Sequence, residues 1–271
     1  VNKRTAALKL SADDCAAVTA LVPRYRFMGG VDVTRHPVTL SMLVTLVCGA
    51  GLSAAPAVGG LTSRAALYEE YIRRFIAAAL ATAAGGNTQS DTGALDDVIA
   101  ALSCVALRML QGGQWHMTVE AAGRLCGERG PPPGATAPWP RLCVACAPSR
   151  VEDEDDPQSN FSWWHKSVGE YLCARAFLRR PLEALAATAA SPWSLMAPAV
   201  LSFFVEACVA APGLADGALR HLVGVVNDAS VDEAKPVVVA SRSNAAALAA
   251  AAGQGLRFDL RDKRLLRCDV R

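Results

Sequence analysis

The amino-acid sequence predicts a mainly helical protein. Hydrophobic residues make up 52% of the 271 residues and aromatic residues only 6%, so the core is built largely from Ala, Leu and Val. Alanine and leucine favour helices. Several segments also space their apolar residues three and four apart, as amphipathic helices do. A chain of this length buries a substantial core in one or two domains.

Charge and cysteine content restrict the partners. A net charge of +2 gives no electrostatic basis for binding nucleic acid or an anionic membrane. Nine cysteines, an odd number without framework spacing, indicate a reducing compartment, and no signal-peptide pattern is present. The uncharged stretch between Arg35 and Arg64 has an unbroken apolar part only over 38–48, too short to span a bilayer. We therefore expect a cytoplasmic protein with no membrane partner and no nucleic-acid partner.

The N-terminal part predicts a short helix, a loop and a buried helix. Capping-box-like spacing from Ser11 begins a helix that ends near Leu21. Residues 25–33 predict a loop. Pro37 then opens a buried helix over 37–48, because the first helical position does not need an N–H.

The next helix is predicted over 61–80, with Thr62 or Ser63 as its cap. Charges of opposite sign four residues apart, at 69 and 73 and at 70 and 74, predict a solvated face. The opposite, apolar face contains Leu67, Tyr71, Ile72, Phe75 and Ile76.

The middle of the chain predicts a linker and two further helices. Small and polar residues over 81–93 form the linker. A helix from about Leu95 is stopped by Gly112 and Gly113, and Thr118 caps a shorter helix that ends near Cys126.

After a proline-rich loop, 141–147 predicts a short strand, followed by the acidic run 152–156 and an extended return at 161–164. A winged-helix domain typically consists of helices, a hairpin-like pair of strands and a closing helix, and here its wing would be acidic. Acidic groups repel phosphates, so the layout indicates an interaction or regulatory module and not a DNA-binding one. Cys143 and Cys146 form a lone C-x-x-C without two further zinc ligands, and we interpret them as half-buried strand cysteines.

The segment Phe161–Leu178, FSWWHKSVGEYLCARAFL, is the most informative stretch. It predicts an amphipathic helix with His165 in its first turn and with Asn160 or Ser162 as its cap. A histidine beside the free N–H groups of a helix start is suited to an anion. Judged on the residues alone, a core helix with a histidine at its edge is the more frequent arrangement.

This segment resembles the winged-helix signature of NACHT-type signalling NTPases, which reads roughly aromatic-x-x-His-x-Ser-x-x-Glu-Tyr-x-x-Ala. From the histidine onward the matching residues are His165, Ser167, Glu170, Tyr171 and Ala174, and the aromatic residues Phe161, Trp163 and Trp164 precede them. The resemblance implies that His165 contacts the phosphates of bound ADP and holds the molecule closed.

A second stretch, Ser63-Arg-Ala-Ala-Leu67-Tyr68-Glu-Glu-Tyr-Ile72, is similar to a pattern of the same family that follows a Pro-initiated apolar helix. In that family these helices form the first helical domain after the nucleotide-binding core. The resemblance assigns to Pro37 the role of packing against the adenine.

The C-terminal part predicts more helices and then a change of pattern. From Pro181 helices recur over about 195–210, 214–226 and 244–252, which resembles the second helical domain of the family. In 256–271 apolar residues recur every five positions, which resembles the first turns of a pentapeptide-repeat β-solenoid. The predicted domains are therefore a helical domain (1–85), a winged helix (92–180), a second helical domain (181–255) and these repeats (256–271).

No G-x-x-x-x-G-K-[ST] occurs in the sequence, and its four histidines accompany no nucleophile–base pair. We therefore expect no catalytic residues and no NTP hydrolysis by this chain alone. By resemblance, it is the regulatory segment of a larger, slow ATPase switch. ADP or ATP would be bound mainly by an upstream domain of the same protein, and activation would produce a homo-oligomer.

Two other interpretations remain open. One is a nucleotide-free helical scaffold for protein–protein interaction, which a phosphate-binding loop upstream would argue against. The other is an integral membrane protein, which would require 38–60 to span the bilayer.

Overall fold

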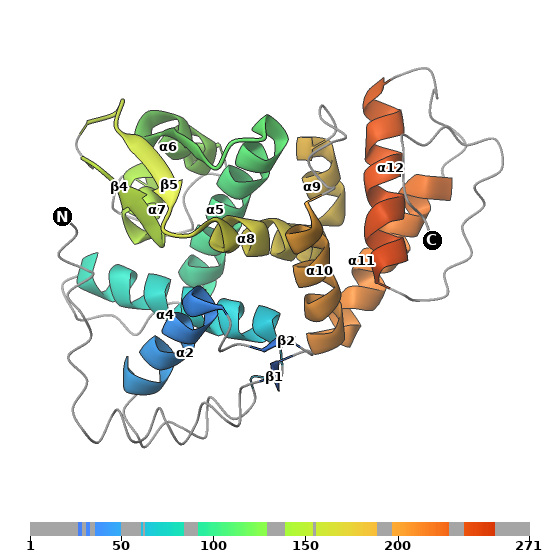
Figure 1. Cartoon of the computed structure of the whole chain (residues 1–271). Coiled ribbons are helices and arrows are strands. Elements are labelled where there is room, and N and C mark those ends of the chain that lie inside the picture. The colour runs from blue at the N-terminus through green and yellow to red at the C-terminus, as the bar shows by residue number, and fades with distance from the viewer. Residues whose placement is uncertain are drawn as a thin grey trace. The chain divides into compact units, whose positions relative to one another are not determined.

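The computed structural model describes residues 27–28, 31–32, 36–49, 61, 63–83, 92–128, 139–153, 156–188, 197–227 and 236–252. They belong to two compact units, Val1–Tyr71 and Ile72–Arg271, each described here by itself. The described part is mainly helical with small antiparallel sheets, so the predicted fold class is confirmed at this level (Figure 1).

The first unit begins with two short strands inside the predicted loop at 25–33. Strands β1 (Phe27–Met28) and β2 (Val31–Asp32) pair antiparallel. Helix α2 (Pro37–Gly49) starts at the expected proline. Over 37–46, Thr39, Met42, Leu43 and Leu46 are buried while Pro37 and Ser41 are exposed, so this part of the helix is buried along one side. The helix predicted over 11–21 lies outside the described residues.

Helix α4 (Arg64–Ala83) begins where the sequence predicts. The Ser63 side-chain oxygen accepts a hydrogen bond from the backbone N–H of Ala66 at 3.1 Å, which confirms Ser63 as a cap. The helix extends three residues past the predicted end, because its alanine-rich tail favours helix as strongly as its amphipathic part does. The predicted linker at 81–93 is correspondingly shorter.

Helix α5 (Thr92–Gly112) is followed by Gly113 at φ +66°, a left-handed conformation that favours glycine. Strand β3 (His116–Thr118) leads directly into α6 (Val119–Gly127). The Thr118 side-chain oxygen accepts from the N–H of Ala121 at 3.2 Å, so the predicted cap is confirmed.

The strand predicted over 141–147 is wrong: α7 (Trp139–Cys146) is a helix. Trp139, Cys143 and Cys146 are buried along it at helical spacing, and α7 packs against α6. A short apolar run without polar alternation is compatible with either a strand or a helix. Here the segment packs against another helix, α6, and is helical.

Strands β4 (Ser149–Val151) and β5 (Asn160–Trp163) follow, and the extended return predicted at 161–164 is confirmed over β5. The three-stranded antiparallel sheet has the order β3-β5-β4, so β5 is its central strand. Met117 and Val151 both pair with Phe161, whose side chain is fully buried.

Helix α8 (Lys166–Arg179) occupies the centre of the second unit and packs against α5 and α10. The sequence predicts one apolar face, with Glu170 on the polar side. That prediction is wrong, because every residue from Val168 to Leu178 is buried, Glu170 and Arg175 included. A helix covered on several sides by neighbours has no solvent face over this length.

The remaining helices all begin at a proline, which suits a first helical position. They are α9 (Pro181–Thr188), α10 (Pro198–Ala210), α11 (Pro212–Asn227) and α12 (Pro236–Ala251). The predicted helices are confirmed, although α12 starts eight residues before its predicted start. The five-residue pattern at 256–271 lies outside the described residues. None of the described helices combines the length and apolar character needed to cross a bilayer.

Candidate functional site

His165 lies at the start of α8, directly after β5, and is itself the N-cap of the helix. Its backbone is extended (φ −148°, ψ 141°), and its Nδ1 accepts a hydrogen bond from the Ser167 N–H at 3.2 Å. The predicted caps Asn160 and Ser162 are wrong, because both belong to β5 and pair with β3. His165 therefore precedes the first turn instead of lying in it.

The cap determines which ring nitrogen of His165 holds the proton. Nδ1 accepts from the backbone and lies 2.6 Å from the Ser167 hydroxyl oxygen. In the neutral ring an accepting Nδ1 leaves the proton on Nε2. Nε2–H has no hydrogen-bond partner among the described residues, and His165 is exposed. The result is an outward N–H donor beside the N–H groups of a helix start.

His165 and Ser167 lie as close together as a catalytic base and its nucleophile, and the sequence did not lead us to expect such a pair. The two residues are only two apart, and the same nitrogen caps the helix. A catalytic pair needs a third group that orients the base through its other nitrogen. No described residue supplies one, and we assign this contact to the cap.

Burial lowers the pKa of His165 below its ordinary value of 6.5, and the positive charge of Arg150 lowers it further, while Glu170 opposes both. The ring is therefore neutral at pH 7, the form in which Nδ1 can accept. A cationic ring would lose this acceptor.

We expect an NMR titration of the His165 ring to give a pKa below 6.5. Since the folded pKa is lowered, the unfolded chain binds more protons than the folded chain between the two values. The contribution of His165 to stability is thus complete above 6.5 and is lost as the pH falls through the folded pKa. A measured pKa at or above 6.5 would contradict the assigned cap.

Aromatic side chains hold the first turn of α8 in place. A Cβ built on Gly169 would lie 2.6 Å from ring atoms of both Trp115 and Trp163, so only glycine lets them approach this closely. The Lys166 ammonium lies 5.6 Å from the centre of the Trp115 ring and 3.3 Å from Glu170. The Lys166 charge is thus balanced by Glu170, one turn further along α8.

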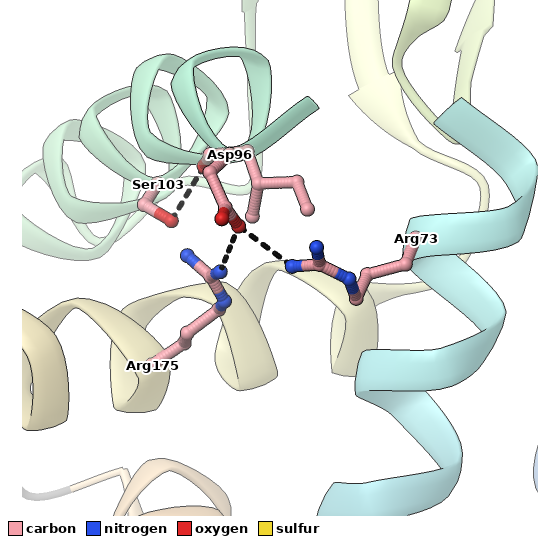
Figure 2. Close-up of polar contacts among 5 residues, drawn as sticks. Arg73, Asp96, Ser103 and Arg175 are labelled. Atoms are coloured by element: carbon pink, nitrogen blue, oxygen red, sulfur yellow. Dashed lines mark hydrogen bonds and ion pairs between the residues drawn. The ribbon is translucent and has the colours of Figure 1, made fainter. Parts of the chain in front are cut away.

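The sequence did not single out an ion-pair cluster that joins α4, α5 and α8. One Asp96 oxygen lies 2.6 Å from Arg73 and 3.3 Å from Arg175, and Figure 2 shows the carboxylate between the two guanidiniums. The sequence predicts Arg73 on a solvated face and predicts no role for Arg175. Nothing in the local spacing relates residues 23 and 79 positions apart.

Pro37, the second predicted contact, is the first residue of α2 and is exposed. Its ring can therefore offer an apolar surface to a flat ligand. Pro37 belongs to the first compact unit and His165 to the second.

The cysteines of the C-x-x-C lie on helix α7 and are fully buried, so the prediction of half-buried strand cysteines is wrong. A hydrogen bond with Cys126, together with burial, raises the pKa of the Cys143 thiol well above its ordinary range. The thiol is the unreactive form. Among the described residues, no group of three or more His, Cys, Asp or Glu side chains is arranged to hold a metal ion.

We expect Cys126, Cys143 and Cys146 to resist iodoacetamide in the folded protein, whereas Cys104, which is only partly buried, reacts. Site-resolved mass spectrometry after alkylation at pH 8 measures each rate. Modification of Cys143 as fast as that of Cys104 would contradict its burial.

No protein-family model, curated protein or solved structure matches the chain.

Proposed function

We propose that this chain is the regulatory segment of a NACHT-type signal-transduction NTPase. It closes over ADP bound to an upstream P-loop domain of the same cytoplasmic protein. Exchange for ATP releases it, and the released protein forms a homo-oligomer. This is a two-state switch biased by the different contacts that one site makes with two ligands.

The element order around β5 is the observation that best supports this proposal. A helix, a strand, two helices and two strands follow one another as α5, β3, α6, α7, β4 and β5, with the sheet order β3-β5-β4. A winged-helix domain would have this element order, and we propose the acidic stretch 152–156 as its wing. His165 and Ser167 of the resemblance motif follow its last strand directly.

The chemistry of His165 suits the proposed contact with phosphate. The ring presents a neutral Nε2–H donor, and the helix start adds backbone N–H groups and a favourable dipole. Arg150 adds positive charge near the ring, and the Glu170 carboxylate opposes it. A phosphate oxygen is the acceptor that these groups favour.

Pro37 would form the adenine wall, since the exposed start of α2 offers the apolar side of its proline ring. The upstream domain would bind most of the nucleotide, and this chain alone would neither bind it tightly nor hydrolyse it. No phosphate-binding loop of the Walker type occurs within its 271 residues.

His165→Ala in the intact protein tests the proposal. We expect ADP to dissociate about tenfold faster, as the loss of one charge-assisted hydrogen bond predicts, and the oligomer to form at lower ATP concentration. His221→Ala is the matched control, because among the described residues this exposed histidine bonds within its own helix, at the Gly217 carbonyl. Equal ADP dissociation rates in the two variants would refute the proposed role of His165.

A nucleotide-free scaffold is the second candidate, and one observation favours it. The Nδ1 of His165 is already used to cap α8, which gives the histidine a structural role without any ligand. In a scaffold, His165→Ala would lower stability by about 1 kcal/mol through the lost cap and would change no nucleotide affinity.

A further inference from the structure

A cleft of about 240 Å³ lies between α5, α8 and α9, within the second compact unit. Its apolar wall contains Leu107 and four alanines, Ala100 from α5, Ala176 from α8, and Ala184 and Ala187 from α9. Helix axes that pack together stay several ångströms apart even where the facing side chains are single methyl groups. The small side chains therefore leave a hollow that leucines at these positions would fill.

The polar part of the cleft has an excess of positive charge. Arg175, Arg179 and Arg180 line it together with two carboxylates, Asp96 and Glu183. Arg175 is 5% exposed and reaches the cleft from the buried face of α8, whereas Arg179 and Arg180 are exposed at its rim.

The two carboxylates of the cleft lie close to its arginines. Asp96 lies 3.3 Å from Arg175 and Glu183 lies 3.5 Å from Arg180. A guanidinium carries five N–H donors in a planar fork and can bind more than one acceptor. Asp96 is also shared with Arg73, which divides its charge between two cations.

We propose that this cleft binds a small molecule that carries an oxyanion, a phosphate or a carboxylate, on a compact apolar body. The anion lies against the Arg179 and Arg180 guanidiniums at the rim, where two forked donors match an oxyanion. The apolar body occupies the alanine-lined wall. This site is separate from the start of α8, since Arg179 is the last residue of that helix and Arg180 follows it.

Cys104 provides a reporter, because it lines the cleft and is only partly buried. Phenyl phosphate and benzoate serve as probes of the two anions, with benzyl alcohol as a neutral compound of similar shape. For a Kd of about 1 mM, a probe at about 10 mM occupies roughly nine-tenths of the sites, and iodoacetamide should modify Cys104 about tenfold more slowly. Slowing by only one of the two anions identifies which oxyanion the site takes.

Two test variants and one control variant of the 271-residue chain show whether the protection of Cys104 depends on the cleft. Arg179→Gln removes a rim cation and should abolish protection, whereas Arg220→Gln, an exposed arginine on α11 outside the cleft, should leave it intact. Ala187→Leu fills the exposed end of the alanine wall and should abolish protection without removing charge. Circular dichroism confirms that each variant folds before it is tested.

Three results would overturn the proposal. They are no protection by either anion, equal protection by benzyl alcohol, and protection that survives both Arg179→Gln and Ala187→Leu. Because no nucleotide and no upstream domain enters this experiment, its failure would leave the proposed switch unaffected.

Discussion

Gly169→Ala is expected to lower the free energy of unfolding by about 3 kcal/mol, the upper range for overpacking a filled site. The new methyl group would lie 2.6 Å from ring atoms of Trp115 and Trp163, closer than such atoms can approach. Both rings would have to move, and Trp163 belongs to the central strand of the three-stranded sheet. Urea unfolding followed by tryptophan fluorescence measures the loss.

Gly224→Ala is the matched control for that experiment. Gly224 lies in helix α11, and a Cβ built there meets no atom within 4 Å. The same substitution should therefore stabilise the protein by about 0.5–1 kcal/mol, because alanine favours helix over glycine. Equal effects of the two substitutions would show that the tryptophans do not enclose Gly169.

Asp96→Asn is expected to destabilise the protein by about 2 kcal/mol, because it removes the carboxylate that neutralises Arg175, a cation buried to 5% exposure. A larger loss is not expected, since the Asp96 side chain is 48% exposed and water screens its charge. Asp97→Asn is the control. It changes the next carboxylate of α5, at nearly the same distance from the helix start, and Asp97 has no ion pair among the described residues.

The effect of Asp96 should depend on pH. Burial by itself raises the pKa of Asp96, but the hydrogen bond to Arg73 and the charges of Arg73, Arg175 and Arg179 outweigh it and bring the pKa below 3.8. A lowered carboxyl pKa stabilises the fold above the unfolded value, and that contribution is lost as the pH falls through the folded value. The stability difference between wild type and Asp96→Asn should therefore disappear in acid. A difference that persists below the folded pKa would contradict the ion pairs.

The sequence was sufficient for features that depend on neighbouring residues. The caps at Ser63 and Thr118, the stop at Gly113 and the helix starts at Pro37 and Pro181 are all set within one turn of chain. Predictions from neighbouring residues failed where contacts between distant parts of the chain determine the structure. Most of the segment 141–147 lies in helix α7, which packs against α6. Asn160 and Ser162 pair with β3 in the sheet instead of capping α8.

The candidate site was predictable only in part. His165 was found from its motif, but its role as N-cap, which fixes the proton on Nε2, required the actual start of α8. Asp96 and the alanine-lined cleft could not be predicted, because each depends on three helices that meet in space. A single sequence contains no periodic pattern that shows which helices pack together.

The sequence of the transcript upstream of the codon for Val1 tests the central proposal most directly. We expect an open reading frame with a glycine-rich Lys-Ser or Lys-Thr loop roughly 150–250 residues earlier, one domain length away. ADP binding by the product of that longer frame would then be the next assay. Translation that starts near Val1, with no such loop, would contradict the switch. The chain would then be a helical scaffold in which His165 only caps a helix.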